Sequence, residues 1–415
     1  MCLVPEEART LPPRRWTVEE IKAAYKKAVH SPIDVTKSLP HKQNRRYIVV
    51  GGSGLVGNWI ISHLIARGER PAAIQTLHLN PPRRELLDLA VQRAFSQPWP
   101  SQVASLPLTV FHKAAVIRPA ERHKAFLPLC RNVNVGGTAN VLNAAKRAGA
   151  SCFVSTSSGS VSIRRPSFWI APWEKIPRHF VQVISDAAEP LKKHDGFFGN
   201  YAASKLEAEG FVRAADDLES SFRTGCIRPA KWNICWLLPT IQNFVNAENV
   251  SIAHLLYEQR LIEHTKNPSG LPNIGGQAFV VTDPNPAVTF GDVFLLLLTL
   301  ATTPVRFPEI PPLPMLLLLH VFEWYILLRH LYLPWLRRPT SEMMQLEPAL
   351  FAMLDPHVII DDSRVRKPPE QGGLGYSPPL TSLDGMCRHL EHWNRLAAER
   401  GTAAMMGKGM RTYTS

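Results

Sequence analysis

Short apolar runs alternate with amphipathic stretches along the first half of the chain. The apolar runs predict β-strands over residues 47–51, 74–79, 108–112, 151–155 and 223–228. The stretches between them predict helices over residues 55–67, 84–95, 133–148 and 200–217. Strands that alternate with helices usually form a parallel sheet with helices on both faces. The pattern therefore predicts an α/β fold with a doubly wound parallel sheet.

Shifts in composition divide the chain into four predicted parts. These are a polar leader (1–45), the doubly wound domain (46–230), a smaller C-terminal substrate lobe (231–400) and a flexible tail (401–415). In the leader, Thr17 is a plausible helix cap and Glu20 follows three residues later, which is the spacing of a capping box. In the lobe, residues 276–283 are expected to form a strand and turn that enter a helix near 290–303.

One stretch of the substrate lobe, residues 311–338, is mostly apolar. Charged residues interrupt its apolar run from Met315 to Leu333, which falls short of what an uninterrupted bilayer span normally needs. A helix here would gather His320, Glu323 and His330 on one face. Two interpretations stay open, namely an amphipathic helix that lies on a membrane surface and a helix buried in the protein or in a homo-oligomer.

The composition narrows the choice of partner and compartment. The chain has 415 residues and a net charge of +13, but its basic residues are scattered and form no nucleic-acid-binding signature. We expect no nucleic-acid partner and attribute the charge to an anionic lipid surface or a phosphate-bearing cofactor. The six cysteines show no metal-ligand spacing, so reduced thiols and no metal site are predicted. Charged residues interrupt the N-terminus, and no signal peptide is expected.

A glycine-rich turn follows the first predicted strand. Gly51, Gly54 and Gly57 have the GxxGxxG spacing, and Leu55 and Val56 open the next helix. Such glycines permit a tight turn and close approach of the backbone to a pyrophosphate, whose oxygens accept from N–H groups at the helix start. The turn predicts a Rossmann-type dinucleotide site, with an ordinary loop as the alternative.

The end of the second predicted strand bears on the choice of cofactor. An acidic residue usually binds the adenosine ribose there, but this chain has His78 at that position. Asn80, Arg83 and Arg84 could receive the 2′-phosphate of NADP, or the arginines could simply be solvated at a helix start. The cofactor is therefore predicted as NAD or NADP.

Tyr201 and Lys205 are candidate catalytic residues. Their i, i+4 spacing places a phenol and an ammonium on one face of the predicted helix. Oxidation of an alcohol needs a base, and a nearby ammonium lowers the pKa of a phenol. A cluster of hydroxyls at the end of residues 151–155 could orient the substrate oxygen. Ser158 is the preferred candidate and Ser157 the alternate, because such a cluster can also be a local cap.

These motifs resemble the extended short-chain dehydrogenase/reductase superfamily, in particular its 3β-hydroxysteroid dehydrogenase and sterol-4α-carboxylate 3-dehydrogenase group. Further matching stretches are HKAAVIRP (112–119), NVGGTANVL (134–142), IRP (227–229), VNAENVSIAH (245–254), DSR (362–364) and LGYSP (374–378). The resemblance implies that Tyr201 accepts the proton, Lys205 binds the ribose and Ser158 holds the substrate oxygen. It also implies that the cofactor lies along Ala114, Ala115, Asn134 and Pro229. NAD is favoured by the resemblance, which also brings in the cytoplasmic face of the endoplasmic reticulum membrane as a location beside the cytoplasm.

The chain departs from the pattern of this group in three places. An edge strand after the second predicted strand is expected to be missing, with Asp88 as a remnant of its acidic end. Residues 231–242 are short for a substrate-pocket segment. Residues 162–199 are long, which favours either a lid over an apolar substrate or a surface insertion.

The preferred functional hypothesis is an NAD(P)-dependent oxidoreductase acting on the 3β-hydroxyl or 3-keto group of a sterol, steroid or polycyclic terpenoid. A nucleotide-sugar epimerase or dehydratase of the same fold is one alternative. A non-catalytic cofactor-binding remnant is another. Peripheral membrane contact and a homodimer are open, as is a following isomerase step.

Overall fold

The computed structural model describes most of the chain between residues 15 and 400. The described ranges are 15–77, 84–118, 121–167, 173–174, 177–187, 190–191, 193–230, 238–284, 287–307, 311–337, 339–340, 348–349 and 355–400. Side chains are not described for residues 84–89, 312 and 400. His78 lies outside the described residues, as do Asn80 and Arg83, so the predicted ribose-binding position does too.

A parallel sheet forms the centre of the protein. Its strands lie in the order β2-β1-β3-β4-β6-β8, and every neighbouring pair is parallel. They are β1 (Arg46–Val50), β2 (Ile74–Leu77), β3 (Leu108–His112), β4 (Ala150–Thr156), β6 (Arg223–Pro229) and β8 (Gln277–Val281). The chain order reverses between β1 and β3, which is where open α/β sheets bind ligands at their carboxyl ends.

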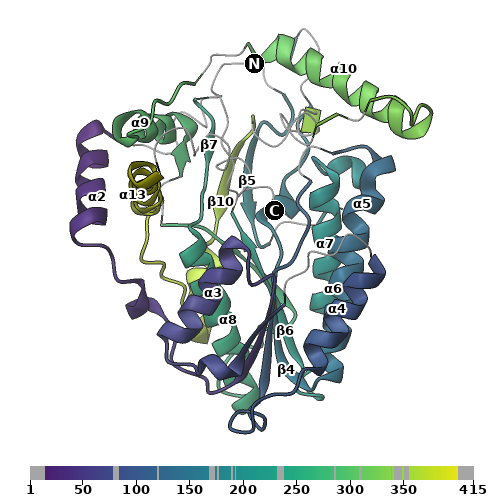
Figure 1. Cartoon of the computed structure of the whole chain (residues 1–415), viewed down its shortest axis with the longest axis vertical. Helices are drawn as coiled ribbons and strands as arrows, with labels where there is room; N and C mark the ends of the chain where they lie inside the picture. Colours follow the sequence, from purple (N-terminus) through teal and green to yellow (C-terminus); the bar gives the residue numbers. More distant parts are fainter. Residues whose placement is uncertain are drawn as a thin grey trace.

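Helices cover both faces of this sheet (Figure 1). One face packs against α3 (Leu55–Ala66) and α8 (Ala247–Lys266), and the other against α4 (Arg84–Ser96), α6 (Gly137–Arg147) and α7 (Asn200–Ala214). Successive residues of β1 alternate between two hydrophobic cores, Tyr47 and Val49 in one and Ile48 and Val50 in the other. The alternation follows from the two-residue period of a strand. The predicted Rossmann-type, doubly wound fold is confirmed.

The strand β2 is the outermost strand of the main sheet in the described part of the chain. Only Leu77 of its residues is buried, whereas β3 is buried throughout. After the undescribed residues 78–83 the chain continues directly as α4. The loss of an edge strand stays a prediction. Asp88 lies in α4, and its side chain is not among those described.

A second, smaller sheet brings together four distant segments in the order β5-β10-β7-β9. These are β5 (Val181–Ser185), β10 (His357–Asp361), β7 (Ile241–Gln242) and β9 (Val288–Thr289). The strand β5 comes from the long segment 162–199 and pairs in parallel with β10 along its whole length. Part of that segment is therefore built into the lobe, while Trp173 within it is exposed.

The leader contributes a helix to the body of the protein. The helix α2 (Val18–His30) has the predicted capping box between Thr17 and Glu20. It packs against α9 (Phe290–Leu300) and α13 (Ser382–Arg400), from the other end of the chain (Figure 1). The division of the chain at residue 230 stays a prediction, and the main sheet itself takes β8 from beyond that point.

The helix α10 (Pro312–Leu331) lies across one end of the molecule (Figure 1). Its Glu323 forms a two-pronged ion pair with Arg122, at 2.7 Å for both contacts. Its His330 packs on Phe126, with ring centroids 4.8 Å apart. Residues 313–331 are long and apolar enough to cross a membrane by length and composition, but 22% of this stretch is buried in the protein.

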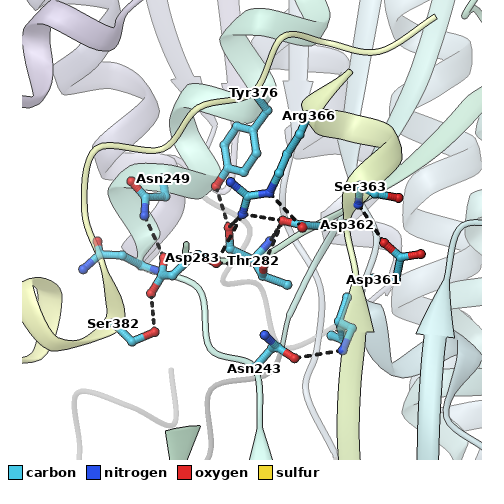
Figure 2. A network of polar contacts seen from close by, with 12 residues as sticks. Asn243, Asn249, Thr282, Asp283, Asp361, Asp362, Ser363, Arg366, Tyr376 and Ser382 are labelled. Carbon is cyan, nitrogen blue, oxygen red and sulfur yellow. Dashed lines mark hydrogen bonds and ion pairs between the residues drawn. The ribbon is translucent and has the colours of Figure 1, made fainter. Parts of the chain in front are cut away.

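A buried polar network joins the carboxyl end of β8 to α8, α13 and α12 (Ser363–Arg366) (Figure 2). The Asp283 carboxylate accepts hydrogen bonds from the Asn246 backbone N–H, Asn249 Nδ2 and Ser382 Oγ, at 2.7, 2.7 and 2.9 Å. Beside it, Asp362 accepts from Thr282 Oγ1 at 2.8 Å. Three of the stretches that carry the family resemblance, 245–254, 362–364 and 374–378, meet in this network. Their matching residues therefore have a structural role.

Asp283→Ala is expected to lower the free energy of unfolding by about 2 kcal/mol or more, because three buried donors lose their acceptor. Asp283→Asn keeps an oxygen acceptor and is expected to cost much less. Burial raises the pKa of Asp283 to about 6. The folded state therefore binds the proton more tightly, and this carboxyl's contribution to stability falls as pH rises from about 4 to about 6.

Urea unfolding at pH 4 and pH 7 measures both effects. The Asn variant is expected to lose less stability than the wild type between these two pH values. Equal stability of the Ala and Asn variants would contradict this role of Asp283.

Candidate active site

The turn between β1 and α3 is shaped by its glycines. Gly51 has a φ of +84°, a conformation that side chains rarely adopt. A Cβ at Gly57 would lie 2.2 Å from the Gly51 carbonyl oxygen, which is too close. Position 57 therefore has no room for a side chain. Gly54 is the N-cap of α3 without a side-chain cap. The turn is therefore tight and its surface is backbone.

The start of α3 fits a phosphate group. Its first turn contains Leu55 and Val56 and no acidic residue, so its N–H groups face no local carboxylate. Unpaired N–H groups and the positive end of the helix dipole favour an anion at this position. These residues fit the pyrophosphate of NAD(P).

The residues after β3 lie against the same turn. A Cβ at Gly51 would be 2.9 Å from the Ala114 backbone nitrogen. Ala115 follows directly, and Asn134 holds Val116 from both sides: Oδ1 accepts its N–H at 2.8 Å and Nδ2 donates to its oxygen at 3.1 Å. Asn134 Nδ2 also donates to Ser204 Oγ on α7 at 3.0 Å. Asn134 thus ties the loop that borders the glycine turn to the helix of Tyr201.

Asn134 lies in a π-helical turn (Asn132–Gly136) that precedes α6, where an ordinary helix was predicted. Such turns insert one extra residue and are frequent at functional sites. The short helix α5 (Leu127–Arg131) leads into it. The predicted helix over 133–148 is otherwise confirmed.

Two neighbouring serines after β4 are placed differently. Ser158 lies beside the Tyr201 side chain and acts to lower the pKa of its phenol, and Ser158 Oγ lies 2.7 Å from Ser160 Oγ. Ser157 is buried, and its N–H donates to the Ile227 oxygen of β6 at 2.7 Å. The structure brings Ser158, and not Ser157, into contact with Tyr201.

Tyr201 and Lys205 lie on α7, as the spacing predicted. Lys205 is buried, and its Nζ donates to the Thr156 carbonyl oxygen at 2.7 Å. Burial raises the pKa of Tyr201 to about 12, although the Ser158 side chain acts in the opposite direction. Burial lowers the pKa of Lys205 to about 8. In the protein alone the phenol is therefore protonated, and any lowering of its pKa has to come with bound cofactor and substrate.

The other side of the site is fixed by a buried ion pair that the sequence did not single out. Arg228 donates to the two Glu209 carboxylate oxygens at 2.9 and 2.6 Å and so joins α7 to β6. At the next residue, the Pro229 oxygen would lie 2.9 Å from a Cβ at Gly159. Glu209 lies on the same helix as Lys205, four residues further on, and that spacing is the one signal that could have drawn attention to it.

Another residue missed by sequence reasoning is His254 of α8. Its Nε2 lies 2.7 Å from Thr156 Oγ1, and its Nδ1 lies 2.8 Å from the Val250 oxygen. Burial lowers the pKa of His254 to about 4, so the ring is neutral at pH 7. Thr156 therefore contacts Lys205 through its carbonyl and His254 through its hydroxyl.

The described cysteines agree with the prediction of reduced thiols. Cys130, Cys152, Cys226 and Cys387 are all free and buried. No group of side chains that could hold a metal ion occurs among the residues that the structure describes.

The fold and the site define an NAD(P)-binding protein with the architecture of short-chain dehydrogenases/reductases. The NAD-binding family described as "Male sterility protein" matches residues 101–232. This match agrees with the predicted NAD(P) cofactor and with the resemblance to the extended members of the superfamily.

Parts of the chain are similar in sequence to two curated dehydrogenases. The chain is 31% identical over 199 residues to a 3β-hydroxysteroid dehydrogenase/Δ5→4-isomerase of Mycobacterium tuberculosis, covering 45% of this chain and 46% of that protein. It is 26% identical over 277 residues to the human decarboxylating sterol-4α-carboxylate 3-dehydrogenase, covering 61% of this chain and 66% of that protein. The first of these matches thus spans about half the length of the relative.

Solved structures agree on the fold. A Thermus thermophilus UDP-glucose 4-epimerase in complex with NAD matches with a TM-score of 0.50 and 16% identity, over 84% of this chain and 98% of the epimerase. A short-chain dehydrogenase/reductase superfamily protein from Agrobacterium tumefaciens matches with a TM-score of 0.51 and 16% identity, over 86% of this chain and 100% of that protein. At these identities the likeness concerns the fold alone.

Proposed function

We propose that the protein is an NAD(P)-dependent oxidoreductase that interconverts a 3β-hydroxyl and a 3-keto group on a sterol, steroid or polycyclic terpenoid. The observation that carries the proposal is the placement of Ser158, after the carboxyl end of β4, beside Tyr201 of α7, with Lys205 one helical turn further along that helix. The names of the two curated relatives support the substrate class.

The residues of the site have the following roles in the proposed reaction. When bound, the nicotinamide supplies the acceptor for the hydride that leaves the alcohol carbon. Tyr201, as phenolate, takes the proton from the substrate hydroxyl, while Ser158 donates to the same oxygen and fixes its position. Lys205 stabilises the phenolate by its positive charge. In the reverse direction Tyr201 returns the proton to the carbonyl oxygen.

The same chemistry has a consequence for a substrate with a carboxylate on the neighbouring carbon. Oxidation would leave a β-keto acid, which loses CO₂ readily. The name of the human relative, a decarboxylating dehydrogenase, supports this variant of the reaction.

The nucleotide-sugar alternative draws on the fold alone, since the epimerase match has 16% identity. The two hypotheses separate in one experiment. Purified protein is incubated with NAD or NADP and either a 3β-hydroxysterol or a UDP-hexose, and reduced nicotinamide is followed by its absorbance. Turnover of the sterol supports the proposal, whereas activity with the UDP-hexose alone would refute it. No activity with either class would favour the non-catalytic alternative.

Membrane contact through α10 is a further part of the proposal. The side of α10 that faces the protein carries Leu316, Leu319, Glu323 and Ile326, all buried. The opposite side is exposed and mostly apolar, and carries Leu313, Leu317, Val321, Trp324, Leu328 and Leu331. Trp335, which is 75% exposed, and Tyr332 follow the helix. A surface helix normally shows the reverse pattern. Exposed leucines flanked by aromatic residues suit the boundary between lipid headgroups and acyl chains.

Val321→Glu/Trp324→Glu is expected to reduce binding to vesicles by at least about tenfold, because two side chains that are 67% and 72% exposed can no longer enter the lipid. Co-sedimentation with phosphatidylcholine/phosphatidylserine vesicles measures the effect. Val29→Glu/Leu218→Glu changes the charge equally on exposed apolar residues elsewhere and is expected to bind as the wild type does.

A wild-type protein that stays in the supernatant would contradict this part of the proposal. If it is instead a dimer that the α10 variant converts to a monomer, the apolar face is covered by a second copy of the chain.

A further inference from the structure

A lysine lies beside the glycine turn. Lys113 follows β3 directly, and its backbone N–H donates to the Val50 oxygen at the end of β1 at 2.9 Å. A Cβ at Gly54 would lie 3.7 Å from Lys113 Nζ. Because Gly54 is the N-cap of α3, the ammonium group is located at the N-terminus of that helix.

The charge of Lys113 is not compensated. Burial accounts for the lowered pKa of Lys113, about 8, and no ion pair joins it to an acidic side chain in the part of the chain that the structure describes. Its titratable neighbours are basic rather than acidic, since Lys113 contributes to the lowered pKa of both Lys205 and His254. The Lys113 side chain is half-buried, and a partly desolvated ammonium without an anion is unfavourable. The arrangement therefore lacks a negative group.

Backbone N–H groups next to Lys113 also lack a negatively charged partner. The first turn of α3 has neither a side-chain cap nor an acidic residue, so its N–H groups await an acceptor. The half-buried ammonium and the uncapped helix start are independent features, and both favour an anion at the same place. An acidic side chain would be the ordinary solution at a helix start, and this turn has none.

We infer that Lys113 is a direct ligand of the pyrophosphate of the bound dinucleotide, together with the N–H groups of Leu55 and Val56. The inference rests on the NAD(P)-binding part of the proposed function. Lys113 would then contribute part of the affinity for the cofactor, in addition to the part contributed by the glycine turn. It also gives the site a positive charge whose effect on binding decreases as salt is added.

Titration with ADP-ribose tests the inference, because this compound carries the pyrophosphate and no nicotinamide. Lys113→Met is expected to raise the Kd for ADP-ribose by about 10- to 100-fold, the loss typical of a hydrogen bond to a charged group. Lys113→Arg is expected to restore binding to within a few fold. Lys266→Met, an equal charge change at an exposed position at the end of α8, is expected to leave the Kd unchanged.

A second readout separates ligand binding from a structural role. Without ligand, the Tm of Lys113→Met is expected to equal or exceed that of the wild type, because an uncompensated buried charge is removed. With saturating ADP-ribose, the rise in Tm is expected to be smaller for the variant. A lower Tm together with an unchanged Kd would show that Lys113 is only structural and would overturn the inference.

The two proposals can fail separately. Sterol oxidation takes no part in these titrations. A wild type that binds ADP-ribose through Lys113 but oxidises no 3β-hydroxysterol would refute the proposed substrate and leave the inference standing. A wild type that does not bind ADP-ribose would overturn both.

Discussion

Tyr201→Phe is expected to lower kcat for oxidation of a 3β-hydroxysterol by about 10²- to 10⁴-fold, the usual contribution of a positioned general base. The change removes one oxygen from a ring on α7 that lies beside Ser158. Packing of the ring and the glycine turn stay as they are, so the Kd for NAD(P) and the KM for the sterol are expected to change little. Steady-state kinetics together with a cofactor titration measure the three quantities.

Tyr25→Phe is the matched control for this variant. It makes the same chemical change on α2, where the Tyr25 hydroxyl accepts a hydrogen bond from Asn394 Nδ2 at 3.2 Å. It is expected to retain wild-type kcat. A Tyr201→Phe protein with unchanged turnover would show that the proton leaves by another route and would refute the mechanism.

Gly57→Ala is expected to weaken binding of NAD(P) by at least about 100-fold, or about 2.7 kcal/mol. A methyl group at this position would lie 2.2 Å from the Gly51 oxygen and 2.9 Å from Gly52 Cα. Both contacts are with backbone, so β1 and α3 have to move apart and the N–H groups at the helix start lose their place. The strain is also expected to lower the free energy of unfolding by roughly 1–3 kcal/mol.

Gly210→Ala is the control for this second variant. Gly210 is exposed within α7, and a Cβ there would meet nothing within 4 Å. The substitution is expected to stabilise the protein by up to about 1 kcal/mol without changing cofactor affinity. Fluorescence titration with the reduced cofactor measures affinity, and urea unfolding measures stability. If Gly57→Ala binds the cofactor as tightly as the control, the glycine turn is not the phosphate site.

Local patterns were sufficient to predict the main sheet and the core of the site. The strands of the sheet are short apolar runs, and the glycine spacing identifies the turn at β1 without any knowledge of distant residues. Tyr201 and Lys205 share a helix, so their spacing alone places them on one face. The choice of Ser158 over Ser157 was left open by the sequence, because it depends on how the chain leaves β4.

Long-range contacts account for what the sequence did not reveal. The strands β7 and β9 are two residues long each, too short to show any alternation. The groups that donate hydrogen bonds to Asp283 come from segments up to 99 residues away in the chain. Lys113 resembles any polar residue after a strand until β1 and β3 pair and bring it beside Gly54. The direction in which the apolar face of α10 points is set by the ion pair of Glu323 with Arg122, a contact between residues far apart in the chain.

Hydride transfer from the sterol carbon is the central claim, and isotope transfer tests it most directly. The protein is incubated with NAD or NADP and a 3β-hydroxysterol that carries deuterium on the hydroxyl-bearing carbon, and the reduced cofactor is analysed by mass spectrometry. The account predicts reduced cofactor heavier by one deuterium with the wild type and almost none with Tyr201→Phe. Reduced cofactor without deuterium, or unaltered sterol and cofactor with the wild type, would contradict it.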